Sequence, residues 1–247
     1  MQRGGQRIGV CEFLASSERL DYTTTMAQFP DTQWSLIRRS VESPSQRHTA
    51  FGQLTLAYRK AISAFFRARL PIADAEDATQ SFLAESLEHA WWSRANADVS
   101  SFRRFLLMLL HRHLGHIRAA QRPAAGNDAI DAIADDGPTA EQQFDNRFAL
   151  VLTQRAVESL RTYYQERERG ALFEKLLPVL GNPPDHGELK CMAEDMGLPA
   201  NTLSVELKRL RQRLRDQVRS ELRELCADER AFENDWTVLQ GVLGISP

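Results

Sequence analysis

One face of the segment 201–219 carries arginines together with short polar side chains, a combination that suits contact with nucleic acid. The residues of this face are Asn201, Thr202, Ser204, Lys208, Arg209, Arg211, Arg215 and Arg219. Short polar side chains hydrogen-bond to base edges, whereas long cationic side chains reach phosphates. A solvated helix in a bundle carries a similar face. The spacing therefore leaves two interpretations open, a DNA-reading helix and a solvated one.

The apolar residues around this face predict a helix, a tight turn and a second helix. Gly197 stands where a chain that leaves a helix often needs a positive φ, and Pro199 suits the start of the next helix. Asn201 or Thr202 is expected to cap that helix. The first apolar stripe is Leu189, Met192, Ala193 and Met196, and the second is Leu203, Leu207, Leu210 and Leu214. This outline is typical of a helix-turn-helix.

A second basic stretch lies at 102–122 and repeats the arrangement. Its cationic positions are Arg103, Arg104, Arg112, His113, His116, Arg118 and Arg122. Phosphate contacts from the two stretches would add, and the affinity would fall steeply with salt. Trp91, Trp92 and Phe102 lie beside these cations, and stacking on unpaired bases is worth about 1–3 kcal/mol each. Burial in the core is the alternative for these aromatic residues.

The residue pattern gives little support to metal binding or to catalysis. His111 and His113 point in nearly opposite directions on a helix and have no cysteine or carboxylate partners at ligand spacing, so we predict no metal site. Asp74 and Asp77 could form a catalytic pair, but acidic residues at a helix start usually complement the helix dipole. Phosphate-loop, dinucleotide-binding and serine-hydrolase motifs are missing from the sequence. We therefore predict that the protein has no catalytic residues, binds no cofactor and is not an enzyme.

The composition is typical of a globular protein, and the cysteine usage indicates a reducing compartment. The 247 residues carry a net charge of −2, and 43% of them are apolar. Cys11, Cys191 and Cys226 are far apart and form no metal-binding or redox pair. The longest apolar run, around 105–110, is too short to span a membrane, and the N-terminal segment is a poor signal peptide. These features predict a cytoplasmic location without a membrane partner.

Helical periodicity predicts an all-α fold with two domains. The segment 123–146 is acidic and rich in small residues, which is typical of a linker. The predicted divisions are a flexible tail at 1–27, a helical domain at 28–122, the acidic linker at 123–146, a helix-turn-helix domain at 147–225 and a C-terminal helical extension at 226–247.

The segments described above, taken in order, resemble an extracytoplasmic-function (ECF) sigma factor, a promoter-recognition subunit of bacterial RNA polymerase. IADAEDATQSFLAESL resembles a region-two helix of that family, and FRRFLLMLLHRHL resembles the following helix, which holds the minus-ten element. The predicted helix-turn-helix resembles region four. One subgroup of the family has motifs similar to three further segments, which are FPDTQWSLI, FDNRFAL and ALFEKLLPVLG. The resemblance covers most of residues 29–245 and implies two helical domains, joined by the acidic linker that threads toward the polymerase active centre.

The resemblance also implies roles for individual residues. The surface that docks on core RNA polymerase would consist of Asp74, Glu76, Asp77, Gln80 and Phe82. The surface for the minus-ten element would consist of Arg103, Arg112, His113, His116 and Arg118. The surface that reads the minus-thirty-five element would consist of Asn201, Ser204, Lys208 and Arg209, with Arg211 on the same basic face. Promoter DNA and core RNA polymerase are the implied partners.

The sequence departs from the family at several positions. Ser81 stands where an acid usually follows the glutamine, with Thr79 close by. We hypothesise that phosphorylation of Thr79 or Ser81 supplies the missing charge, which would make a Ser/Thr kinase a further partner. The alternative is that Asp74, Glu76 and Asp77 suffice for docking. An anti-sigma protein is another candidate regulator. Pro199 and Ser204 also differ from the usual residues and leave the promoter sequence open.

Two other classes of function compete with this interpretation. A stand-alone helix-turn-helix regulator would bind duplex DNA without polymerase and would usually need a dimer. A helical interaction protein would bind no DNA at all. Association with core RNA polymerase would distinguish a sigma factor from both other classes. Binding to duplex DNA without polymerase would distinguish a stand-alone regulator from a helical interaction protein.

Overall fold

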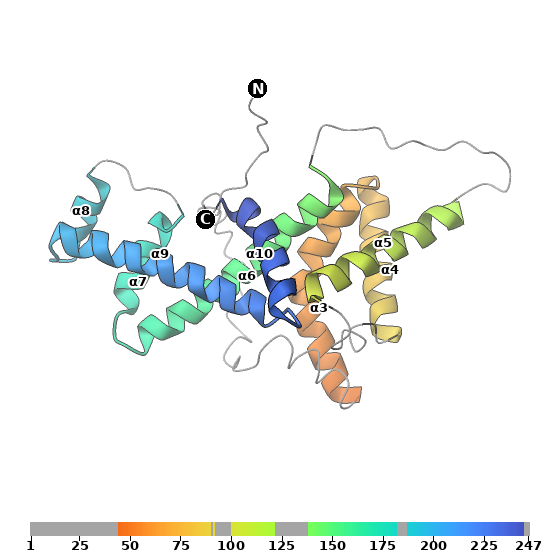
Figure 1. Ribbon diagram of the computed structural model, residues 1–247, viewed down its shortest axis with the longest axis horizontal. Coiled ribbons are helices and arrows are strands. Elements are labelled where there is room, and N and C mark those ends of the chain that lie inside the picture. Colours follow the sequence, from red (N-terminus) through yellow and green to blue (C-terminus); the bar gives the residue numbers. More distant parts are fainter. Residues whose placement is uncertain (1–43, 90, 92–99, 122–137, 182–186, 245–247) are drawn as a thin grey trace, which may run out of the picture. The chain divides into compact units, whose positions relative to one another are not determined.

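The computed structural model describes residues 44–89, 91, 100–121, 138–181 and 187–244, and these form an all-α fold (Figure 1). In this part of the chain the all-α prediction is confirmed, since the only extended pairing is an isolated bridge. The predicted tail at 1–27, the FPDTQWSLI motif, Trp92 and most of the predicted linker lie outside the described residues.

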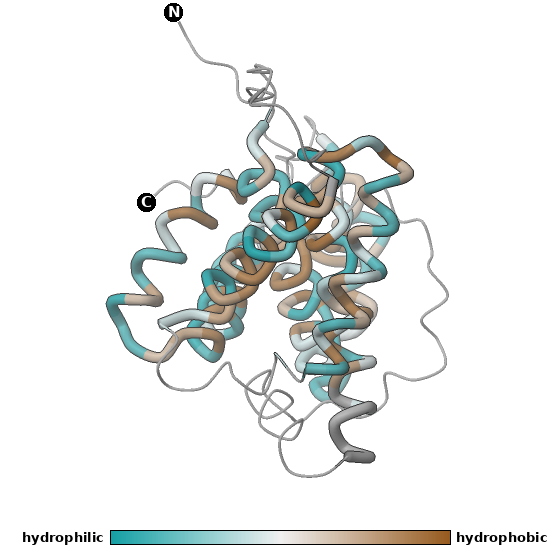
Figure 2. Tube along the Cα trace, turned by 90° about the vertical axis from the view of Figure 1, so that its right-hand side faces the viewer, coloured by the Kyte–Doolittle hydropathy of each residue, from teal (hydrophilic) through white to brown (hydrophobic). Residues whose placement is uncertain are grey.

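In the described part of the chain, four helices of 17 to 26 residues come first, three short elements follow, and two longer helices complete the order. In order they are α3 (Pro44–Arg67), α4 (Ile72–Glu88), α5 (Phe102–Gln121), α6 (Ala140–Gln165), α7 (Gly170–Leu176), the 3-10 helix η2 (Leu177–Val179), α8 (Glu188–Asp195), α9 (Ala200–Arg223) and α10 (Glu229–Leu243). Hydrophobic and polar residues are interspersed along these helices, as the colouring of Figure 2 shows. Such amphipathic periodicity provides each helix with one face for a core.

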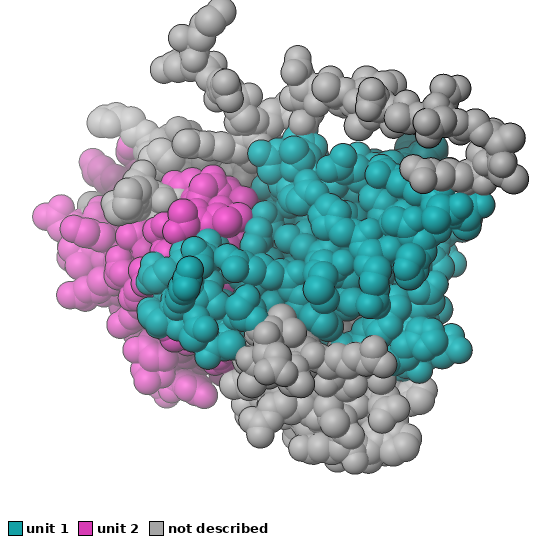
Figure 3. Space-filling model, turned by 45° about the vertical axis from the view of Figure 1, so that its right-hand side comes forward, with its two compact units in different colours: residues 1–5, 31–148, 225–235 teal, residues 6–30, 149–224, 236–247 magenta. Residues whose placement is uncertain are grey.

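The chain forms two compact units (Figure 3). Among the described residues, unit 1 contains those within 44–148 and 225–235, and unit 2 those within 149–224 and 236–244. Two of the divisions among the described residues fall inside α6 and α10, whereas the division between 224 and 225 lies one residue from the boundary predicted after 225. Unit 1 therefore includes the first part of α6 and the segment 225–235, which the sequence predicts to lie in the linker, the second domain and the C-terminal extension.

Aromatic side chains dominate the core of unit 1. Tyr58 on α3 has its ring 5.1 Å from the ring of Phe102 and 5.4 Å from the ring of Phe148, measured between centroids. These contacts join α3, α5 and α6. The other aromatic side chains fully buried in this unit are Phe65, Phe66, Phe82, Phe144 and Phe232. Because burial of a large apolar side chain stabilises by about 1.5–3 kcal/mol, Phe144, Phe148 and Phe232 explain why their segments belong to this unit.

The start of α6 corrects the predicted linker, which was expected to extend to residue 146. Thr139 and Gln142 form a reciprocal capping box at this helix start. The Thr139 amide donates to Gln142 Oε1 at 2.8 Å, and the Gln142 amide donates to Thr139 Oγ1 at 3.2 Å. A capping box satisfies two amides that have no partner within the helix. The chain is consequently helical from Ala140, and 140–146 are part of α6.

Unit 2 buries the apolar stripes that predicted the helix-turn-helix. Its core cluster includes Leu160, Tyr164, Phe173, Leu176, Ala193, Leu203, Leu207 and Leu210, from α6 to α9. At the end of α8, Gly197 has φ +63° and donates its amide to Glu194 O at 3.0 Å. The Leu198 amide donates to Ala193 O at 2.9 Å. These two bonds define a Schellman motif, which confirms the predicted turn at Gly197.

The predicted side-chain cap of α9 is wrong. Pro199 occupies the N-cap position with φ −62° and ψ 137°, and no side chain caps the helix there. Asn201 and Thr202 lie inside the first turn, where both are exposed. Proline has a φ close to that of a helix and lacks the amide proton that a cap would otherwise have to satisfy.

Candidate nucleic-acid interface

The outer face of α9 exposes most of the polar residues expected to read DNA. Leu203, Leu207 and Leu210 are buried on the opposite face. The exposed residues are Asn201, Thr202, Ser204, Lys208, Arg209 and Arg215. The sequence therefore predicted the orientation of these residues correctly, whereas Arg211 and Arg219, which were expected on the same outer face, are half-buried.

A buried carboxylate on α9 reduces the positive charge of this face. Glu206 is buried and forms ion pairs with Arg209 and Arg169, with N–O distances of 2.9 Å in both cases. The side chain of Arg209 remains largely exposed despite this contact. Lys208 is exposed beside it and thus supplies the neighbouring positive charge on the outer face. The sequence showed Glu206 but not that it faces Arg169 across the unit.

Arg211 has a structural role that the sequence did not predict. Its Nε donates to Leu180 O at 3.0 Å and its terminal nitrogen to Val179 O at 2.8 Å. Carbonyls at a helix end lack partners within the helix, and Arg211 satisfies two of them beside η2. Since its guanidinium is engaged with the backbone, we correct the expectation that Arg211 contacts DNA.

A second unpredicted cluster in unit 2 surrounds the adjacent residues Tyr163 and Tyr164. The guanidinium carbon of Arg167 lies 3.6 Å from the ring centre of Tyr163, and that of Arg213 lies 5.1 Å away. A terminal nitrogen of Arg213 also donates to Tyr164 Oη at 2.9 Å. Tyr164 and Arg213 are 49 positions apart, so helical periodicity could not reveal the pair. The contacts of Arg213 with the two tyrosines join α9 to α6 within the unit.

On α5 of unit 1, three of the cations expected to face the minus-ten element are exposed: Arg112, His116 and Arg118. The guanidinium carbon of Arg112 lies 4.9 Å from the ring centre of Trp91. Trp91 and Phe102 are both buried. They therefore belong to the core, and the idea that they stack on bases is wrong.

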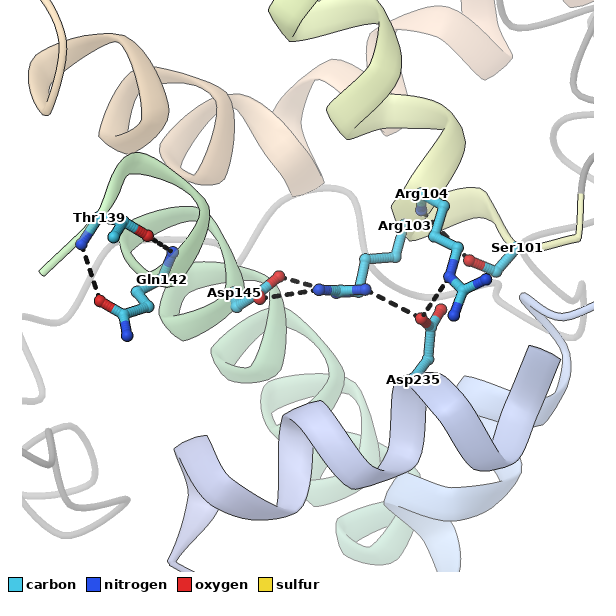
Figure 4. Close-up of polar contacts among 7 residues, drawn as sticks. All are labelled: Ser101, Arg103, Arg104, Thr139, Gln142, Asp145 and Asp235. Atoms are coloured by element: carbon cyan, nitrogen blue, oxygen red, sulfur yellow. Dashed lines mark hydrogen bonds and ion pairs between the residues drawn. The ribbon is translucent and has the colours of Figure 1, made fainter. Parts of the chain in front are cut away.

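Arg103 is buried in an ion cluster, which corrects its assignment to DNA (Figure 4). Its Nε and one terminal nitrogen donate to the two carboxylate oxygens of Asp145 at 2.7 and 2.8 Å. Its other terminal nitrogen donates to Asp235 Oδ1 at 2.9 Å. Burial by itself lowers the pKa of Arg103, but the hydrogen bonds and charges of the two carboxylates outweigh burial and raise it above its usual value. Arg103 is therefore charged and fully occupied inside unit 1.

The Asp145 carboxylate contributes the matching half of this pair. Burial raises the pKa of Asp145 and outweighs the lowering effect of Arg103. A buried charge without its partner is strongly unfavourable, typically by about 3–5 kcal/mol. The sequence placed Asp145 in a linker, because an acidic run without basic residues carries no sign of a partner 42 residues earlier.

His113 is also directed into unit 1 rather than toward DNA, since only 3% of its surface is exposed. Its ring packs against Phe66 and Phe82, with centroid distances of 5.8 and 5.6 Å. Burial lowers the pKa of His113, and the opposing effect of Glu85 is smaller. The assignment of His113 to the minus-ten face is therefore corrected.

Ser81, His113 and Glu85 are arranged in a row. His113 Nε2 lies 3.0 Å from Ser81 Oγ, and His113 Nδ1 lies 3.3 Å from Glu85 Oε2. Such a row can activate a serine hydroxyl, but catalysis also needs donors for the developing oxyanion. Ser81 lies inside α4, where the backbone amides are engaged in helical hydrogen bonds. We therefore interpret the row as a polar contact between α4 and α5.

The residues expected to dock on polymerase lie on α4 and differ in their exposure to solvent. Asp74, Asp77 and Gln80 are exposed and recur at three-residue spacing on one side of the helix. Glu76 is half-buried and forms an ion pair with Arg59. Phe82 is fully buried, so its side chain cannot contact a partner and that assignment is corrected.

The two candidate phosphorylation sites differ in access. Thr79 is fully buried, and its hydroxyl donates to Ala75 O at 2.7 Å. A kinase cannot reach this hydroxyl in the folded unit, which removes Thr79 as a candidate. Ser81 is exposed and remains accessible beside His113.

Within the described residues, no group of three or more histidines, cysteines or carboxylates could hold a metal ion. No described helix has the length and apolar character needed to cross a membrane. Comparisons of the chain with known protein families, with curated proteins and with solved structures give no match.

Proposed function

We propose that this protein is an ECF-type sigma factor that binds core RNA polymerase and directs promoter recognition and DNA opening. One observation carries most of this proposal. The α8 and α9 helices are joined by a Schellman turn at Gly197, and α9 buries its leucines while exposing short polar residues near its start and cations further along. That arrangement suits insertion of a helix into a major groove.

The proposal assigns promoter contacts to the exposed residues only. Asn201, Ser204, Lys208 and Arg209 read the minus-thirty-five element, and each good base contact is worth about 1–3 kcal/mol of discrimination. On α5, the minus-ten surface is reduced to Arg112, His116 and Arg118, which are exposed. These cations act mainly on phosphates and make DNA binding dependent on salt.

The polymerase surface is proposed on α4. Asp74, Asp77 and Gln80 give it an exposed acidic and polar side. The acidic stretch that precedes α6 connects α5 to the part of α6 that belongs to unit 1, and in this proposal it passes toward the polymerase active centre. In this proposal the protein acts in the cytoplasm without a cofactor and catalyses no reaction of its own.

Regulation is proposed at Ser81. A phosphoryl group there would add negative charge to the polar side of α4 that contains Gln80 and Asp77. A Ser/Thr kinase would be the regulating partner, and an anti-sigma protein is the alternative. This regulatory step is separable from the sigma-factor function, because the acidic residues of α4 can also bind polymerase without it.

Run-off transcription tests the proposal. Purified protein and core RNA polymerase are combined with a library of upstream sequences, and the transcripts identify the promoters selected. A stand-alone helix-turn-helix regulator would instead bind duplex DNA without core enzyme and would give no transcripts. That outcome would reject the sigma-factor proposal in favour of its main competitor.

A further inference from the structure

The segment Leu225–Asp235 lies against the start of α5 within unit 1, and we call it the strap. The Phe102 amide donates to Leu225 O at 2.9 Å, and the Ala227 amide donates to Ser100 O at 3.0 Å. Ser101 and Cys226 thereby form an isolated antiparallel bridge. The backbone of the strap is thus paired with the residues that begin α5.

A carboxylate of the strap contacts both arginines of the first turn of α5 (Figure 4). Asp235 is 0% exposed and accepts from Arg103 at 2.9 Å. Its Oδ1 also lies 3.5 Å from Arg104 Nε. Carboxylates and phosphates bind guanidinium groups in the same way, through charged hydrogen bonds. Asp235 therefore takes the place that a phosphate would need in order to reach Arg104.

The strap and α5 have complementary charges. The strap contains four carboxylates and one arginine, a net charge of −3. By contrast, α5 contains four arginines and no carboxylate. An acidic segment on a purely basic helix competes with any other polyanion for that surface.

Arg103 and Arg104 differ in what would happen if the strap left. Arg103 would keep its two hydrogen bonds to Asp145, which belongs to α6. Arg104 contacts Asp235 with its guanidinium, and its side chain is already 46% exposed. Departure of the strap would therefore uncover Arg104 and leave Arg103 paired.

We propose that the strap is an autoinhibitory segment that competes with nucleic acid for the start of α5, with Arg104 as the cation that it masks. This inference rests on the proposed function, because it takes α5 to be a DNA-binding helix. It adds that the chain regulates this helix with its own C-terminal residues.

A reversible crosslink tests the inference in one and the same molecule. Ser101 and Cys226 form the closely spaced type of antiparallel pair, in which Cα atoms lie about 4.5 Å apart, within the range for a disulfide. The full-length protein receives Ser101→Cys together with Cys11→Ser and Cys191→Ser, so that only one disulfide can form. Diamide oxidises the two thiols to this disulfide, and dithiothreitol reduces it again. Burial raises the pKa of Cys226 to about 12, so the introduced thiol must react first.

The readout is fluorescence anisotropy of a labelled single-stranded oligonucleotide at several salt concentrations. The reduced form should bind more tightly, and its plot of log affinity against log salt should be steeper by about 0.7, one phosphate contact on a single strand. Asp235→Asn should change the salt slope in the same direction, whereas Glu233→Gln, an exposed neighbour with the same charge change, should leave it nearly unaltered.

Equal affinity of the oxidised and reduced forms would overturn the strap inference and leave the proposed function intact, because both forms still bind. Tighter binding by the oxidised form would also overturn it, since the strap would then organise the binding surface. If neither form binds and the wild-type protein does not associate with core RNA polymerase, the strap inference and the proposed function are both rejected.

Discussion

Arg103 and Asp145 share two parallel hydrogen bonds of 2.7 and 2.8 Å, in which a buried guanidinium faces a buried carboxylate. This pair joins the start of α5 to the first turns of α6. A residue from the expected DNA surface and a residue from the expected linker thus form one structural contact. Their pairing places the helix that follows the acidic stretch within unit 1.

Asp145→Ala should destabilise unit 1 by about 3–5 kcal/mol, because Arg103 would keep a buried charge with one of its partners missing. Urea unfolding followed by circular dichroism measures the change. Asp74→Ala, which removes an exposed carboxylate, is the control and should shift stability by less than about 0.5 kcal/mol. Similar losses for the two variants would show that the buried pair contributes nothing special.

His113 should make stability depend on pH. Because burial lowers its pKa below the usual 6.5, the unfolded chain takes up the proton first as the pH falls. The unfolded state then binds more protons, so the free energy of unfolding decreases as the pH drops from about 7.5 through 6.5 and toward the folded pKa. Unfolding of wild type and His113→Gln at pH 7.5 and 5.5 tests this. The variant should lose less stability, and an identical loss contradicts the assignment.

Aspartate substitutions should affect the two hydroxyl residues of α4 very differently. Thr79→Asp places a charge at a fully buried site and should cost several kcal/mol of stability, whereas Ser81→Asp should be tolerated at an exposed site. Thermal unfolding measures both variants. If Ser81 also regulates docking, Ser81→Asp should bind core RNA polymerase more tightly than wild type, and equal affinity ends that idea.

Lys208→Ala should weaken promoter-specific transcription more than it weakens polymerase binding. Loss of a good base contact is worth about 1–3 kcal/mol, roughly a 5- to 150-fold decrease in promoter output. Lys60→Ala, an exposed lysine on α3 of unit 1, provides a charge-matched control. Unchanged output from Lys208→Ala in run-off assays counts against the placement of the reading helix.

Local patterns predicted the parts of the fold that depend on neighbouring residues. The leucine stripe at 203–214 indicated the inner face of α9, and Gly197 indicated the turn before it. Thr139 and Gln142 stood at capping-box spacing, yet the surrounding acidic residues favoured a linker. The signal for the start of α6 was therefore present in the sequence but outweighed by composition.

Pairs distant in the sequence could not be predicted in this way. Asp145 lies 42 and Asp235 lies 132 residues from Arg103, and neither helical periodicity nor composition links such positions. Arg211 likewise contacts backbone carbonyls 31 and 32 residues earlier. Periodicity distinguishes an inner from an outer face, but a long cationic side chain near the boundary can serve either one.

The central claim is most directly tested by size-exclusion chromatography of the purified full-length protein mixed with core RNA polymerase. We predict that wild type or Ser81→Asp elutes with the enzyme, and that Asp74→Ala combined with Asp77→Ala weakens this association. If both wild type and Ser81→Asp elute separately from the enzyme, the result contradicts the proposed function.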